Sequence, residues 1–539
     1  MDRNRDYRNV YQKAPDIALT VMLALAFAGI GLISYYAVTG TYLIRRFDGQ
    51  SSVYIADDPV KQLAVFGIFL AAVLVTGFLW DRLCRDKERT ADLILNILSV
   101  LSIVIGLAFL LHHPYYMDGD QINTFYAAVY AADEGSSVQY AMFSPGGYIG
   151  IYPQQKGLVF FYYLLYHVVG DKMFDSVQYL HLLYPAVIMH AGYHALEEEG
   201  ISPFARAVYC IMIFACFPMY LYIPYMYGDL GAVAFTAAFV FFFIKYLNTA
   251  RVYHVLGMCL CGSIALLMRM QIWILLIAAF IVLLVAYMRK RKPLIFVTGV
   301  CILAAAFLAN MAVGKFFEKK SGYKDVEGVP ALCWVAMGLQ ETNGDPGVYN
   351  RYNQGTFEAN GFDADKTSAA AKEEIGNRID ALKDDKEHAK WFFETKLRQE
   401  WTAPDMEGIS MTSVWDTLSG TDPIAAPAWL DELYRSGPLY EKLINLANRY
   451  QTLVYLSAAI LAVLMFFRKK SEMPYIVQLV LIYFLGGLMF FTFWENKARY
   501  ILPYFMALIW MVPYAVDELR RLFKRKNGHV KVRNENFDI

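Results

Sequence analysis

The stretch that separates the apolar parts of this chain is residues 112–157, HHPYYMDGDQINTFYAAVYAADEGSSVQYAMFSPGGYIGIYPQQKG. It places two carboxylates, Asp118 and Asp120, directly after a hydrophobic run. Apolar runs of about 20 residues, the length that a helix needs to cross the hydrocarbon core, lie on both sides of it. A loop that only joined two spans would not need acids, amides and tyrosines together, so we expect it to form the floor of a site at the outer membrane surface.

The composition is that of a membrane protein. Of 539 residues, 57% are hydrophobic and 18% are charged, whereas about 25% are charged in an ordinary soluble domain. We therefore expect an all-α polytopic membrane protein. The formal net charge is zero, so charge gives no indication of partners; membrane lipids are expected around the chain, and nucleic acid is not.

The hydropathy pattern predicts about twelve transmembrane helices. They are expected near residues 17–39, 61–80, 92–112, 179–196, 203–223, 229–247, 252–268, 272–288, 293–313, 449–467, 473–493 and 499–516.

The positive-inside rule orients these helices. With a cytoplasmic N-terminus, five basic clusters fall in the cytoplasm. They lie at residues 82–89, 245–251, 289–292, 468–470 and in the C-terminal tail. This solution requires the apolar residues 157–169, which are too few to span comfortably, to form an interfacial or re-entrant helix. If that helix crossed, every later loop would invert.

The same topology predicts the division of the chain. Residues 1–313 would form a transmembrane module that includes a first outer loop, 112–178. Residues 314–448 would form an α-rich extracytoplasmic domain, 449–517 the C-terminal transmembrane helices, and 518–539 a cytoplasmic basic tail.

Three outer carboxylates are candidate catalytic residues. Asp120, or else Asp118, could act as a general base or bind a divalent metal such as Mg²⁺ or Mn²⁺, with Asp229 as a further acid. The alternatives are a helix N-cap for Asp120 and an ordinary interfacial acid for Asp229. His112 and His113 could join a metal site or simply end the third span.

A second set of side chains is expected to contact substrate. The segment 152–157, YPQQKG, offers amides and a lysine at a helix start, where sugar hydroxyls or a phosphate could bind; proline there is also structurally ordinary. The residues expected to bind substrate are Tyr152, Gln154, Gln155, Lys156 and Tyr227.

Positively charged residues on the outer side run against the positive-inside bias, so we expect each of them to have a ligand or an ion-pair partner. They are Arg269, Lys497 and Arg499, with Glu495 beside the last two. An arginine can grip a lipid-linked phosphate bidentately. The alternative is an ion pair with Asp229 or Glu495.

Together these motifs resemble the GT-C glycosyltransferases, in the branch near the protein O-mannosyltransferases and the aminoarabinose transferases of lipid A. The residues that carry the resemblance are Asp120 or Asp118 after span 92–112, the YPQQ segment 152–155, Asp229, and the Glu495, Arg499 and Pro503 turn. The spans 17–39 and 61–80 are additional to the usual core.

The resemblance implies an enzyme of a bacterial plasma membrane with its active site on the outer face. It would move a sugar from a polyprenyl-phosphate carrier to an acceptor, namely a cell-wall glycopolymer, a glycolipid or a protein. It would do so by inverting direct displacement, with or without a divalent metal. A carboxylate would deprotonate the acceptor while cations hold the departing phosphate.

Other functions stay open. A transporter or flippase of lipid-linked saccharides would need polar residues deep within its spans, but this sequence places them at the outer ends. A non-catalytic scaffold or receptor, and an enzyme that ligates whole glycans, are the remaining alternatives.

Overall fold

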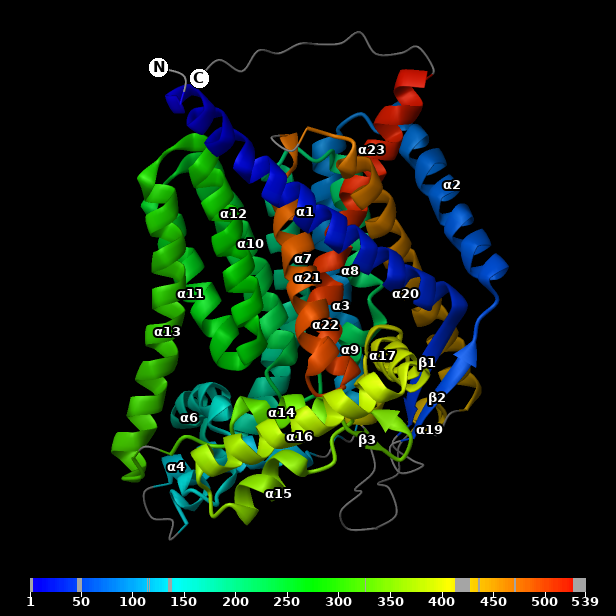
Figure 1. Cartoon of the computed structure of the whole chain (residues 1–539). Helices are drawn as coiled ribbons and strands as arrows, with labels where there is room; N and C mark the ends of the chain where they lie inside the picture. Colours follow the sequence, from blue (N-terminus) through cyan, green and yellow to red (C-terminus); the bar gives the residue numbers. More distant parts are fainter. Residues whose placement is uncertain are drawn as a thin grey trace.

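The computed structural model describes most of the chain as a bundle of α-helices (Figure 1). The described residues are 3–45, 51–113, 115, 117–133, 138–324, 326–412, 427–434, 437–469 and 472–526. Among them, strands occur in two short antiparallel pairs. These are β1 (Gly40–Arg45) with β2 (Ser51–Ala56), and β3 (Glu341–Thr342) with β4 (Asp345–Pro346).

Nine described helical segments are long and apolar enough to cross a membrane. They are α1 (Arg3–Thr39), α2 (Pro59–Leu83), α3 (Lys87–His112), α10 (Asp229–Thr249), α12 (Trp273–Lys290), α13 (Pro293–Ser321), α20 (Pro438–Phe466), α21 (Tyr475–Phe493), and the segment Ala498–Lys524 that contains α22 (Leu502–Ile509) and most of α23 (Met511–Lys526). The protein is therefore an all-α, multi-pass membrane protein.

The other three predicted spans are helical, but they do not meet the same criterion. Residues 179–196 lie within α7 (Met173–Glu198), which carries many polar side chains. The predicted span 203–223 is divided into α8 (Pro203–Phe214) and α9 (Phe217–Leu221). The third, α11 (Val252–Met268), is apolar but has only 17 residues. Twelve spans thus stay a prediction.

Local chemistry accounts for where several helices begin. Asp58 precedes α2, and its carboxylate accepts the amide of Val60 at 3.0 Å; Pro59 takes the first helical position, where no N–H is needed. Asp363 caps the charged helix α16 (Ala364–Asp384) in the same way. These signals are readable in the sequence, because capping side chains act on the turn that directly follows them.

Shorter helices gather at one end of the bundle. Figure 1 shows α4, α6 and α14 to α17 at the lower end, whereas α1 begins and α23 ends at the opposite end. The shorter helices are α4 (Gly119–Ala132), α5 (Tyr148–Ile151), α6 (Lys156–Val169), α14 (Ala331–Gly338), α15 (Tyr352–Ala359), α16, α17 (Lys386–Trp401), α18 (Gly408–Met411) and α19 (Ala428–Tyr434). Short 3₁₀ turns connect elements at Ala141–Phe143, Pro153–Gln155, Gly170–Lys172, Met270–Ile272 and Ala498–Ile501.

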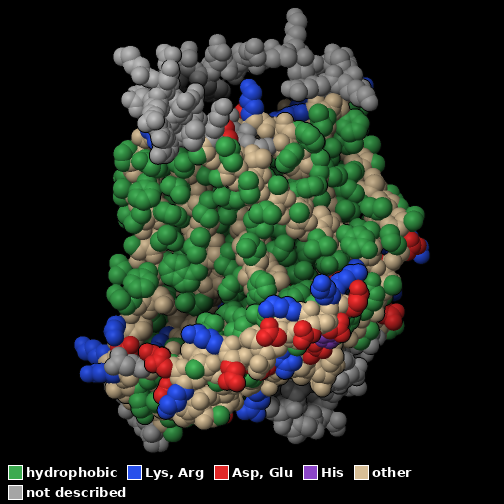
Figure 2. Space-filling model, viewed as in Figure 1, with side chains coloured by type: hydrophobic (Ala, Val, Ile, Leu, Met, Phe, Trp, Pro, Cys, Tyr) green, Lys and Arg blue, Asp and Glu red, His purple; other side chains and the backbone are tan. Residues whose placement is uncertain are grey.

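The surface chemistry follows the same division. Figure 2 shows a mostly hydrophobic surface over the long helices and a concentration of acidic and basic side chains over the lower end. A hydrocarbon core can surround the first surface without leaving charges unsolvated, and water can solvate the second.

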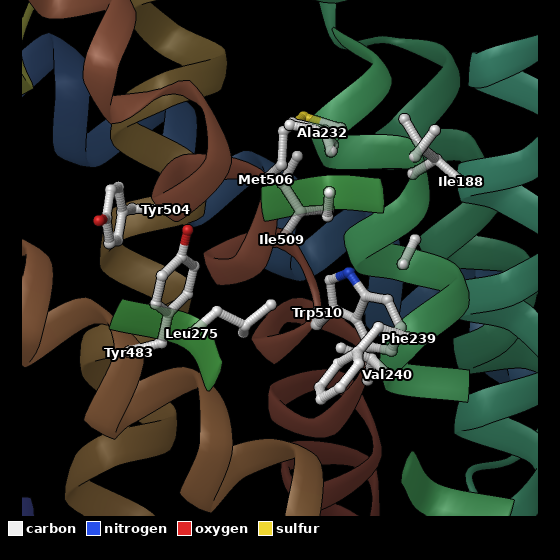
Figure 3. Packing of buried hydrophobic residues seen from close by; sticks show 14 of the residues in the cluster. Ile188, Ala232, Phe239, Val240, Leu275, Tyr483, Tyr504, Met506, Ile509 and Trp510 are labelled. Carbon is white, nitrogen blue, oxygen red and sulfur yellow. The ribbon is translucent and has the colours of Figure 1, made fainter. Parts of the chain in front are cut away.

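The C-terminal helices pack against α10 inside the bundle. Figure 3 shows Met506, Ile509 and Trp510 directed towards side chains of α10 such as Phe239 and Val240. Beside them, the rings of Tyr483 and Tyr504 stack with centroids 4.3 Å apart. This buried packing fixes the start of α22 relative to the start of α10, which matters because charged residues stand at both starts.

The segment expected as a separate domain, 314–448, is continuous with the bundle at both ends. Helix α13 runs on to Ser321, and α20 begins already at Pro438. Trp401 of α17 packs its ring against Phe484 of α21, 5.1 Å away. Parts of this segment, 413–426 and 435–436, and the tail from 527 onwards lie outside the described residues.

Candidate active site

A cavity of about 560 Å³ lies at the end of the bundle that carries the short helices. Ten of the twelve site residues predicted from the sequence line it. They are Asp118, Asp120, Tyr152, Gln154, Gln155, Tyr227, Arg269, Glu495, Lys497 and Arg499. The two that do not line it are Asp229 and Lys156. Residues more than 370 positions apart in the sequence are thus brought to one cavity.

Two glycines allow the segments around Arg269 to approach one another. A Cβ at Gly157, in the first turn of α6, would stand 2.2 Å from the carbonyl oxygen of Leu267. A Cβ at Gly228 would stand 2.4 Å from the carbonyl oxygen of Met268. Both α6 and the start of α10 therefore rest directly on the backbone that precedes Arg269.

Asp120 stands in the first turn of α4, and Asp118 takes the N-cap position. Gly119 makes this possible with φ of +50°, a conformation that favours glycine. Asp120 is therefore not the N-cap that the sequence left open as an alternative. Its side chain keeps 41% of its surface exposed, and this surface faces the cavity.

The neighbours of Asp120 stabilise the ionised form of its side chain. The Tyr148 hydroxyl donates to Oδ1 at 2.8 Å, and the Arg499 guanidinium lies 3.4 Å from Oδ2. Burial raises the pKa of Asp120, but Arg499 and Lys497 lower it further, so the net shift is below the usual value. Asp120 is thus ionised at neutral pH and open to a hydroxyl in the cavity.

Two arginines share one pair of aromatic rings. The guanidinium carbon of Arg269 lies 5.1 Å from the ring centroid of Tyr227 and 5.4 Å from that of Tyr500. For Arg499 the corresponding distances are 5.2 and 5.4 Å. Arg499 also donates to the hydroxyl of Tyr225. The rings lower the cost of holding two like charges close together in a largely buried place.

Lys497 completes a group of three cations. Its Nζ lies 3.2 Å from Oε1 of Glu495, and Oε2 of the same carboxylate accepts the Tyr500 hydroxyl at 3.0 Å. Burial lowers the pKa of Lys497, but Glu495 more than compensates and the net shift is upward. The lysine therefore stays charged, and Glu495 serves as its counter-ion within the cavity wall.

Asp229 does not line the cavity but contacts Arg269, which does. Its side chain is fully buried, and its Oδ1 lies 3.3 Å from Nε of Arg269. This is the ion pair that the sequence analysis raised as an alternative. Asp229 is thus the buried counter-ion of Arg269.

Two predicted binding residues have other contacts. The amide of Gln155 donates to the Tyr227 hydroxyl at 2.5 Å, so it orients a ring that both arginines use. Lys156 opens α6 outside the cavity lining, and burial lowers its pKa. The segment YPQQKG is therefore divided, with Tyr152, Gln154 and Gln155 on the cavity and Lys156 off it.

The candidate metal ligands do not form a cluster in the described part of the chain. No group of three or more His, Cys, Asp or Glu side chains there is arranged to hold a metal ion. His113 is buried, with Nε2 2.6 Å from the Tyr434 hydroxyl, and its pKa is lowered by that burial to about 4. His112 ends α3 with an exposed side chain.

Sequence reasoning missed several residues that touch the predicted set, and Tyr148 and Glu407 are two of them. Tyr148 donates to Asp120, and Glu407 accepts the amide of Ala498 at 2.7 Å, between Lys497 and Arg499. Glu407 lines the cavity with φ of +60°, a strained conformation for a residue with a side chain. No local pattern marks either residue, because each acts through a contact with a distant segment.

No family model matches the chain, and no curated protein matches it either. The cavity places the accessible carboxylate of Asp120 beside three cations, at one end of a bundle of membrane-length helices. Four further acidic residues line it: Asp118, Asp345, Glu407 and Glu495.

Proposed function

We propose that the protein is a GT-C-like glycosyltransferase of a bacterial plasma membrane. It would take a sugar from a polyprenyl-phosphate carrier on the outer face and transfer it to an acceptor hydroxyl by inverting displacement. The observation that carries the proposal is Asp120, an accessible carboxylate that shares a cavity with Arg269, Lys497 and Arg499.

The chemistry needs a base and a site for the leaving group, and the cavity supplies both. The acceptor O–H would give its proton to Asp120 while its oxygen forms a bond to the anomeric carbon. The bond from that carbon to the phosphate oxygen breaks, and the phosphate leaves with the electron pair. Negative charge passes from the carboxylate to the phosphate, and the three cations stabilise it there.

The position of the cations suits a lipid-linked phosphate. Arg269 directly precedes the candidate span Met270–Lys290, and Arg499 lies at the start of the candidate span Ala498–Lys524. A phosphate at this level could keep its polyprenyl chain in hydrocarbon while guanidinium groups bind its oxygens. Asp229 would act as a positioning residue that fixes Arg269.

The test is release of undecaprenyl phosphate from a panel of polyprenyl-phosphate sugars by the purified protein, with and without Mg²⁺ or Mn²⁺. Turnover of a donor by the wild type supports the reaction class, and the metal arms decide whether a divalent ion takes part. Arg269→Gln and Lys497→Ala should raise the donor KM at least about tenfold, because each removes a charge-assisted contact. Lys383→Ala, at an exposed lysine of α16, is the matched control.

A different outcome would favour the transporter. If no donor turned over while lipid-linked saccharides crossed the bilayer of proteoliposomes, the glycosyltransferase proposal would be wrong. If neither activity appeared and a ligand still bound the cavity, the receptor alternative would gain support.

A further inference from the structure

One wall of the cavity differs in chemistry from the Asp120 side. It is formed by uncharged aromatic and amide side chains, most of them from the segment that includes α14 and α15. We name it the amide wall and define it by Tyr152, Trp334, Tyr349, Asn353 and Gln354. Amides offer both donors and acceptors, and the rings offer apolar faces.

The amide wall begins next to the proposed base. The ring of Tyr152 lies 5.2 Å from that of Tyr148, whose hydroxyl donates to Asp120. On its other side, Tyr152 lies 6.1 Å from Trp334, which stacks in parallel on Trp494. A molecule bound along these rings would therefore reach Asp120 with one end.

The charges around the wall disfavour an anionic ligand. Asp345 also lines the cavity there, where its carboxylate accepts Ser52 Oγ at 2.5 Å and Gln399 Nε2 at 2.6 Å. Lys497 stands at the border over the Tyr349 ring, 5.5 Å from its centroid, but it is paired with Glu495. Among the described lining residues, the other cations are the two arginines placed with Asp120.

We infer that the amide wall is an acceptor site for an uncharged saccharide. This inference rests on the proposed function, because it assigns the hydroxyl that Asp120 would deprotonate. Sugar hydroxyls can donate to Oε1 of Gln354, whose Nε2 donates to Glu358 at 2.7 Å. Asn353 is only 1% exposed, and its Oδ1 accepts the amide of Gln354, so it holds the start of α15 in place. The C–H faces of a sugar ring can lie on Tyr152 or Tyr349. The cavity volume of about 560 Å³ lies within the range of about 300–1,000 Å³ for small-molecule sites.

The position of the wall favours a soluble glycan end over a lipid acceptor. Its residues at 334–354 belong to α14, α15 and the segment between them, outside the candidate spans. Figure 2 shows charged side chains over the lower end of the molecule on the face in view. A lipid acceptor would have to leave the bilayer to place its headgroup there, whereas a glycan would enter from water.

Direct binding tests the site separately from catalysis. The purified full-length protein in nanodiscs would be titrated calorimetrically with maltotriose, cellotriose, chitotriose and tri-galacturonate. The variants are Gln354→Ala and Tyr349→Ala, with Asn377→Ala as the control, an exposed amide of α16 outside the cavity.

We expect at least one neutral trisaccharide to bind and tri-galacturonate not to bind. Gln354→Ala and Tyr349→Ala should each raise Kd about tenfold, while Asn377→Ala stays within about threefold of wild type. The inference is overturned if no neutral trisaccharide binds, if the charged one binds equally well, or if the two wall variants bind like wild type. If binding follows the expectation but no donor turns over, the site stands and the proposed reaction falls.

Discussion

The ion pair between Asp229 and Arg269 gives the sharpest prediction for stability. In Asp229→Asn, Arg269 would lose the carboxylate that lies 3.3 Å from its Nε. The Arg269 side chain is only 10% exposed, so water could replace little of that contact. Removing one partner of a buried pair costs about 3–5 kcal/mol, because the other charge is left uncompensated. Arg269 would retain the rings of Tyr227 and Tyr500, so we place the cost near the lower limit, about 3 kcal/mol.

This cost is large enough to measure. With an unfolding entropy of about 2 cal/mol/K per residue, a chain of 539 residues should lose about 3 °C in Tm for 3 kcal/mol. The double variant Asp229→Asn with Arg269→Gln removes both charges at once. It should recover most of the loss, because two neutral amides at this distance need no counter-ion.

The assay is thermal unfolding of the four proteins in one detergent, with carrier release measured in parallel. Asp380→Asn, at a carboxylate with 74% of its surface exposed, is the control and should change Tm very little. The double variant should be stable but should bind the donor weakly, because it lacks Arg269. The reasoning is refuted if Asp229→Asn keeps its stability and loses activity alone, which would make Asp229 a residue that touches substrate.

Three further predictions concern other parts of the site and the opposite end of the bundle. Glu407→Ala should lower carrier release at least tenfold, because the amide of Ala498 loses its acceptor, whereas Glu407→Gln should keep most of the activity in the same assay. Tyr148→Phe should lower kcat by about tenfold, since Asp120 loses a donor at 2.8 Å. Burial raises the pKa of Glu199 to about 7, although the first amides of α21 donate to it and lower it. The folded protein therefore holds a proton that the unfolded chain loses above about pH 4.5, so this contribution to stability falls as pH rises from 4.5 to 7. Glu199→Gln should flatten the dependence of Tm on pH across that range.

Each of these predictions has a contrary result. Equal loss of activity in Glu407→Gln and Glu407→Ala would show that charge, and not the hydrogen bond to Ala498, is what matters. A Tyr148→Phe variant with wild-type kcat would separate the Asp120 contact from catalysis. A Glu199→Gln variant with the same pH slope as wild type would assign that slope to another group.

The membrane character and most of the long helices could be predicted from the sequence. The physical reason is that a span needs about 20 apolar residues in one run, and such runs are visible in the sequence itself. The sequence does not decide whether α7, α8 and α11 span the membrane. These helices are shorter or more polar than the others, and their burial depends on neighbouring helices. The composition of a segment does not show which other helices pack against it.

The site was partly predictable for a different reason. Charges beside the ends of apolar helices must lie near the membrane surface, so Asp120, Arg269 and Arg499 could be placed at one level from the span pattern. The sequence placed Asp120 before Asp118 but could not supply the structural reason, which is the contact of Asp120 with Tyr148 and Arg499. The burial of Asp229 behind Arg269 likewise needed the tertiary structure.

The most direct test of the central claim is carrier release by Asp120→Asn. The variant keeps the size of the side chain, replaces one acceptor oxygen with an amide donor, and removes the ability to take a proton at neutral pH. With Asp118→Asn and Asp380→Asn as matched variants, we predict that Asp120→Asn loses at least about 100-fold in kcat. Wild-type turnover by Asp120→Asn, or a comparable loss in Asp118→Asn alone, would contradict the assignment of Asp120 as the base.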